Sequence, residues 1–157
     1  MAVSVKPITL WRRELQDRPG ALAESLGPLA DDRVSIKVLM AYRFPGEPGR
    51  AAVELFPVTG RRAVAAAERA GFGSSSIPAL LVEGEDAPGL GARLSGAVAS
   101  AGINLDFVVA QVIGNRYSAV FGFADEEGSR RAAPLMKTAA TPPRAVARKT
   151  SRQRKRR

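Results

Sequence analysis

Side chains that most often do chemistry near neutral pH are scarce in this chain of 157 residues. It contains no histidine and no cysteine, which removes the commonest general base, the commonest metal ligand and every thiolate site. Catalysis would then need carboxylates or lysines that converge on one substrate. The acids near strand ends and turns are scattered: Glu14, Asp17, Glu24, Glu54, Glu85, Asp86 and Asp106. Because no spacing joins two of them into an acid–base pair, the sequence predicts a protein that is not an enzyme and that uses no cofactor.

Two copies of one short motif are more informative. Asp17-Arg18-Pro19-Gly20 recurs 69 positions later as Asp86-Ala87-Pro88-Gly89. The same offset aligns the apolar residues that follow: Leu29 with Val98, Val34 with Ile103, Ile36 with Leu105 and Val38 with Phe107. A repeat at a fixed period predicts two copies of one structural unit.

Each copy has the same order of predicted elements. Short apolar or alternating runs indicate strands, and apolar residues spaced by three and four after each Pro-Gly turn indicate helices. In the first copy the expected strands are 8–15, 34–40 and 51–56, with a further short one at 72–76. In the second they are 77–83, 103–107 and 118–123. We therefore predict an α+β fold of two tandem ferredoxin-like βαββαβ units, 5–76 and 77–140, with antiparallel sheets and helices on one face.

The second copy lacks an obvious final strand. Pro134 interrupts its last helical segment, and only a few residues follow before the composition changes. The open edge of that sheet is then either left short or covered by the neighbouring copy or by a second chain.

Positive charge is concentrated at the end of the chain. Residues 141–157 hold eight of the 24 lysines and arginines and no acid, which leaves 16 basic against 15 acidic residues in the remainder. With Thr141-Pro142-Pro143 as a linker, this segment is expected to be a disordered basic tail. Nucleic acid is a candidate partner through this tail only, with these residues contacting phosphates: Arg152, Arg154, Lys155, Arg156 and Arg157. No apolar run predicts a membrane span, and a cytoplasmic location is the default expectation.

The repeat resembles the ACT-domain family in its tandem form. That family's pattern opens with a strand, continues with D-x-P-G-x-L and a helix, and enters the second strand with G-I-N-[IL]. The matching segments are Asp17-Arg18-Pro19-Gly20-Ala21-Leu22, Asp86-Ala87-Pro88-Gly89 and Gly102-Ile103-Asn104-Leu105, and the resemblance covers about residues 7–140. The first copy departs at Arg33-Val34-Ser35-Ile36, where Gly and Asn are expected, and the second at Gly91, where the helix usually places Leu.

This resemblance implies regulation by a bound amino acid, in homodimers whose sheets join edge to edge. In relatives the ligand lies at the turn between the first strand and the first helix, beside the Asn that enters the second strand. The corresponding positions are Asp86, Pro88, Gly89, Leu90 and Asn104 in the second copy and Asp17, Pro19, Gly20 and Ala21 in the first. Physical chemistry favours the same place, because the N–H groups at a helix start suit a carboxylate and Asp86 could pair with an ammonium group.

Each of these residues also has a purely structural explanation. The glycines could serve only the turns, the aspartates could cap the helices, and Asn104 could stabilise its own loop. Three functions therefore stay open: a sensor of an amino acid or similar small molecule that signals to another enzyme or regulator, a nucleic-acid-binding protein, and a ligand-free dimerisation scaffold.

Overall fold

The computed structural model describes residues 3–141, which form two four-stranded sheets, each backed by two helices. All neighbouring strands are antiparallel, and their orders are β3-β4-β2-β5 in the first sheet and β1-β6-β8-β7 in the second. The first half contains β2 (Trp11–Gln16), α1 (Ala21–Asp31), β3 (Val38–Arg43), β4 (Arg50–Phe56), α2 (Arg61–Arg69) and β5 (Gly73–Ser74). The second contains β6 (Ala79–Glu85), α3 (Leu90–Ser100), β7 (Leu105–Ile113), β8 (Arg116–Phe123) and α4 (Glu126–Ala140). The predicted α+β class is confirmed.

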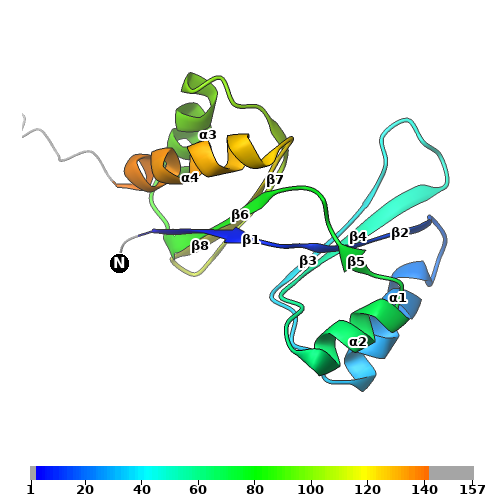
Figure 1. Ribbon diagram of the computed structural model, residues 1–157. Coiled ribbons are helices and arrows are strands. Elements are labelled where there is room, and N and C mark those ends of the chain that lie inside the picture. The colour runs from blue at the N-terminus through cyan, green and yellow to red at the C-terminus, as the bar shows by residue number, and fades with distance from the viewer. Residues whose placement is uncertain (1–2, 142–157) are drawn as a thin grey trace, which may run out of the picture.

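The N-terminal strand belongs to the second sheet. The strand expected over 8–15 is two strands, β1 (Ser4–Ile8) and β2, and β1 pairs antiparallel with β6 from Ser4↔Glu83 to Ile8↔Ala79. Residues 5–8, which we assigned to the first unit, thus complete the sheet of the second, because β6 offers an unpaired edge where that copy lacks a last strand. Figure 1 shows β1 and β2 following one another from one sheet into the other.

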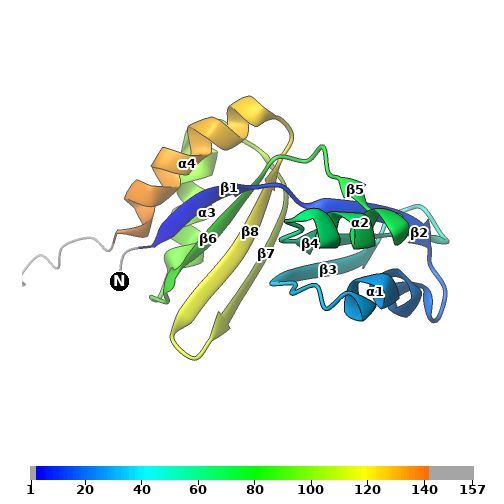
Figure 2. The same ribbon diagram turned by 60° about the horizontal axis from the view of Figure 1, so that its bottom comes forward.

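Helices cover only one face of each sheet. In Figures 1 and 2, α1 and α2 lie on one side of the first sheet, and α3 and α4 lie on the opposite outer side of the second. Alternating residues of the strands fill these two helix-facing cores, with Val53 and Leu55 in the first and Leu80, Val82 and Phe121 in the second. The other faces are therefore free to meet.

A third apolar cluster joins the two sheets. It is built from strand residues that point away from the helices, and Leu10, at the crossing between β1 and β2, is fully buried in it. Its buried members are Leu10, Met40, Ala79, Leu81 and Val120, with Ile8, Val38, Phe56 and Phe107 packed around them. The two halves are thus joined by this third cluster as well as by the short link between β1 and β2.

The end of the described chain differs from the prediction in one respect. α4 continues through Pro134 to Ala140, so this proline does not interrupt the helix. Asp125 caps its start, since the carboxylate accepts from the N–H of Gly128 at 2.7 Å. The tail expected over 141–157 lies, from residue 142 onward, outside the described residues. No helix within 3–141 has the length and apolar character needed to cross a membrane.

Gly84 allows β1 to approach β6 closely, and this close approach provides a test of the pairing between β1 and β6. A Cβ at Gly84 would lie 2.8 Å from Cα of Val3, whereas a Cβ at Gly96 in α3 would meet nothing within 4 Å. We expect Gly84→Ala to lower the free energy of unfolding by about 1–3 kcal/mol. Gly96→Ala, the matched control, should raise it by about 0.5–1 kcal/mol because alanine restricts the unfolded chain. Urea unfolding measures both, and equal effects of the two substitutions would contradict the pairing of β1 with β6.

Candidate ligand site at the strand-to-helix turns

The two Pro-Gly turns have the same backbone geometry. Gly20 and Gly89 are the N-caps of α1 and α3, and both are left-handed, with φ of 85° and 79°. Other residues rarely adopt this conformation, so the turn alone requires glycine at both positions. No side chain caps either helix, and the N–H groups of Asp17 and Asp86 donate instead to the carbonyls of Gly49 and Asn115. The aspartates therefore do not serve as helix caps.

At the first turn, Asp17 already has a partner. Its carboxylate Oδ2 lies 2.6 Å from Nε of Arg43, which extends from the edge strand β3. A cavity of about 240 Å³ lies between this turn and β3, and Asp17, Ala21 and Leu22 are among the residues that line it. Of the predicted residues of this copy, Asp17 and Ala21 thus face a common space, while Pro19 and Gly20 are exposed on the turn itself.

At the second turn, Tyr117 occupies the place that aliphatic residues such as Leu22 and Ala51 occupy in the cavity of the first turn. Tyr117 pairs with Gly84 in the same way that Ala51 pairs with Leu15 in the first copy. The hydroxyl of Tyr117 lies 4.0 Å from where a Cβ of Gly91 would be, and Gly91 corresponds to Leu22. This explains the departure at Gly91, because the phenol occupies space that a leucine would need. Tyr117 was missed from sequence, although the unexpected glycine was the signal for it.

The predicted residues of the second copy do not all meet. Asp86, Pro88 and Gly89 are exposed at the turn, but Leu90 is 2% exposed and belongs to the core under α3 and α4. Leu90 therefore does not line a ligand site. The guanidinium of Arg93 donates to the carbonyls of Pro88 (3.1 Å) and Ala139 (3.2 Å), so it fastens this turn to α4.

Asn104 lies at the other end of the sheet. It precedes Leu105, which pairs with Phe123, whereas Asp86 follows Glu85, which pairs with Arg116 at the opposite end of β8. With a rise of about 3.3 Å per strand residue, the length of β8 from Arg116 to Phe123 separates Glu85 from Leu105 by roughly 23 Å along the strands. Within one chain, Asn104 therefore does not lie beside Asp86. Asn104 instead lines a cavity of about 270 Å³ with Asp125 and Arg131.

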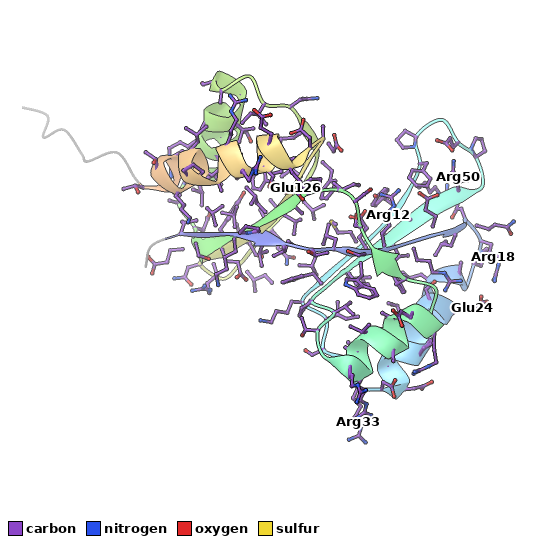
Figure 3. All side chains as sticks on the ribbon, viewed as in Figure 1. Arg12, Arg18, Glu24, Arg33, Arg50 and Glu126 are labelled. Carbon is purple, nitrogen blue, oxygen red and sulfur yellow. The ribbon has the colours of Figure 1, made fainter. Side chains whose placement is uncertain are left out.

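The acids of the open face of the first sheet are neutralised by arginines. Arg12 donates to buried Glu54 at 3.0 Å and to Glu14 at 3.1 Å, and Arg50 donates to Glu14 at 2.6 Å. Figure 3 shows Arg12 and Arg50 in this part of the first half. Ion pairing to these arginines lowers the pKa of Glu14, which suits a structural network better than proton transfer. Among residues 3–141, no group of three acids could hold a metal ion.

Comparisons with known proteins show the fold. No family model and no curated protein matches the sequence. Among solved structures, protein BT0572 from Bacteroides thetaiotaomicron is 13% identical with a TM-score of 0.69, covering 85% of this chain and 89% of that one. The regulatory subunit of aspartate kinase from Thermus thermophilus is 19% identical with a TM-score of 0.58, covering 90% and 98%. A putative C-terminal regulatory domain of aspartate kinase from Porphyromonas gingivalis is 10% identical with a TM-score of 0.52, covering 90% and 97%. The chain has an ACT-like fold.

Both tyrosines of the chain should lose their phenol protons at a higher pH than an unperturbed tyrosine does. Burial, and then the charge of Asp86, raise the pKa of Tyr117, while burial and Glu54 raise that of Tyr42. A group whose pKa is higher in the folded state binds more protons there, so the free energy of unfolding falls as the pH rises above about 10. We expect the absorbance of tyrosinate at 295 nm to appear in the folded protein only above the pH at which it appears in urea.

The double variant Tyr42→Phe/Tyr117→Phe is the control for this titration. In this variant, the part of the alkaline loss of stability that comes from the phenols should vanish. Tyrosine absorbance that rises at the same pH in folded and unfolded protein would show that these side chains are solvated.

Proposed function

We propose that this chain is a non-catalytic sensor that binds an amino acid at the turn between β6 and α3 and acts as a homodimer. The observation that carries the proposal is the open start of α3. Its first-turn N–H groups have no side-chain cap, and Gly89 has no Cβ to shield them. Such a helix start attracts a carboxylate, and exposed Asp86 beside it supplies a negative charge for an ammonium group. The fold is shared with regulatory parts of aspartate kinases, which supports a regulatory role.

The edge strand β7 supports the dimer. It has no neighbour beyond β8 within the described chain, and apolar side chains are exposed on both of its faces. Val108 and Val112 on the helix side are 43% and 48% exposed, and Val109 and Ile113 on the other side are 48% and 71% exposed. A long apolar edge with unpaired backbone groups is a template for pairing with another chain. A second copy of β7 satisfies both the backbone and the apolar surface.

Antiparallel pairing of two β7 strands would also complete the ligand site. Such pairing sets the beginning of one β7 beside the end of the other. The end of β7, Ile113, lies at the same end of the sheet as Asp86, because both Ile113 and Glu85 pair with Arg116. Asn104 of the partner subunit would then lie at the same end of the joined sheet as Asp86 and Gly89. Residues at opposite ends of one chain's sheet would thus share one end of the dimer's sheet.

The proposed mechanism is a shift in the population of dimers. A ligand whose carboxylate meets the α3 start and whose ammonium meets Asp86 would also accept a hydrogen bond from Asn104 of the partner subunit. Since that contact exists only in the dimer, the ligand favours the dimer by its differential affinity. The output passes to another protein, a partner enzyme or regulator. At the first turn, Arg43 holds Asp17, and a ligand there has to compete with that ion pair.

The first test is a thermal-shift screen of the full chain against the common amino acids. A true ligand at about 100 times its Kd adds about 2.7 kcal/mol to the free energy of unfolding. Asp86→Asn should abolish the shift because it removes the charge that meets the ammonium group. Asp31→Asn, an exposed aspartate at the end of α1, should leave it unchanged. The absence of a shift with every amino acid would favour the ligand-free scaffold.

The second test examines the dimer and its shared site. Ile113→Lys should give a monomer in sedimentation analysis because it places a charge in the paired edge, whereas Leu135→Lys on α4 should not. Asp86→Asn and Asn104→Ala should each lose ligand binding when assembled alone. A mixed dimer of the two keeps one intact Asp86–Asn104 pair only if the residues come from different chains. Recovery of half the sites supports the shared site, and no recovery refutes it.

A further inference from the structure

A second cavity, remote from the strand-to-helix turns, is strongly cationic. It has a volume of about 490 Å³ and lies between the loop that follows α1 and the start of α2. Arg33 and Lys37 line it from the loop, and Arg61 and Arg62 from the helix. The only acid in its lining is Asp32. A concave surface with charges of one sign concentrates ions of the opposite sign.

Asp32 does not neutralise this cavity. Its carboxylate Oδ2 lies 2.5 Å from Nη2 of Arg69, and Oδ1 lies 3.6 Å from Nε of Arg62. The hydrogen bond from Arg69, more than any other contact, keeps the pKa of Asp32 low. This acid is thus shared between two arginines, one of them outside the lining. In residues 3–141, Arg33, Lys37 and Arg61 have no acid within ion-pair distance.

Arg33 has an unusual backbone conformation. Arg33 has a φ of 53°, the one positive φ among non-glycine residues within 3–141. The corresponding residue of the second copy is Gly102, with a φ of 70°. The first copy therefore keeps an arginine at the rim of the cavity where glycine would be less strained. Figure 3 shows Arg33 at the outer tip of the first half, near the end of α1.

The corresponding cavity of the second half lacks this charge. It is smaller, at about 270 Å³, and its lining includes Asp125 and Glu127 as well as Arg131. Asp125 there accepts a hydrogen bond from the helix start. In the first half the equivalent helix start has Gly60 as its cap, and Arg61 and Arg62 stand where the second half has Glu126 and Glu127. The cationic character is thus a property of one copy and not of the fold.

We propose that the cavity between the α1–β3 loop and the start of α2 binds a small, multiply charged anion, with Arg33, Lys37 and Arg61 as its contacts. The planar forks of Arg33 and Arg61 suit the oxygens of a phosphoryl or carboxylate group, and Lys37 adds a mobile charge. A volume of about 490 Å³ accommodates a metabolite. The anion site is independent of the amino-acid site and lies in the other half of the chain.

The test titrates inorganic pyrophosphate and, separately, citrate into the full chain by calorimetry. Binding by pyrophosphate alone identifies a phosphoryl site, and binding by both identifies a general polyanion site. Arg33→Gly separates a binding role from a structural one, because glycine relaxes the backbone while the charge is lost. We expect Arg33→Gly to raise the thermal midpoint and to weaken anion binding about tenfold. Arg61→Ala should weaken binding similarly.

Two controls locate the effect. Arg130→Ala removes an exposed arginine of α4 far from the cavity and should leave anion affinity unchanged. Every variant retains the basic residues 142–157, so their contribution to anion binding is the same in all of them. If binding persisted undiminished in both Arg33→Gly and Arg61→Ala, the anion site would lie elsewhere and the proposal would be overturned. No heat with either anion at about 10 mM, a concentration that would reveal even a Kd in the millimolar range, would overturn it as well. Any amino-acid shift should be the same in Arg33→Gly and the unaltered protein, so the two proposals fail separately.

Discussion

The pairing of the N-terminal strand β1 with β6 of the second sheet is the constraint on which the rest of the architecture depends. The second copy supplies only three strands of its own, and its sheet is complete because Ser4–Ile8 pair with β6. The chain then has to pass from one sheet to the other within two residues, and Leu10 is buried at that crossing. This short link draws the open faces of the two sheets together around Met40, Leu81 and Val120. Buried apolar contacts consequently connect the two halves.

Within this frame the two copies have diverged in complementary ways. At the strand-to-helix turn, the first copy has an open cavity, and its Asp17 is paired with Arg43. In the second copy the side chain of Tyr117 takes up the corresponding space, and Asp86 is exposed. At the start of the second helix, the first copy gathers arginines around an open cavity, and the second caps the helix with Asp125. A duplicated scaffold supports different surface chemistry because the helix-facing cores hold the backbone while loop side chains vary.

The sequence predicted the features that depend on residues close together in the chain. Turn chemistry and apolar periodicity depend on neighbouring residues, so the Pro-Gly turns, the four helices and the order of elements could be placed from the repeat. The partner of β1 could not be, because Val5 and Ile8 suit any apolar edge and pairing across more than 70 residues leaves no local trace. The separation of Asn104 from Asp86 was missed for a related reason: the register of the sheet decides whether two such residues meet in space, and register cannot be read from one short motif. Arg43 and Tyr117 also reach the turns from strands distant in sequence.

The early position of β1 in the chain affects how the protein is synthesised. Residues 4–8 leave the ribosome long before 79–85, so this apolar strand is without its native neighbour while the whole first half is being made. The first sheet is complete once β5 has emerged, but the contacts that bury Leu10 require the second. Until residues 79–85 have been made, the strand of residues 4–8 therefore has no partner. Its later pairing with β6 closes a loop of about 70 residues and bears the entropy of that closure.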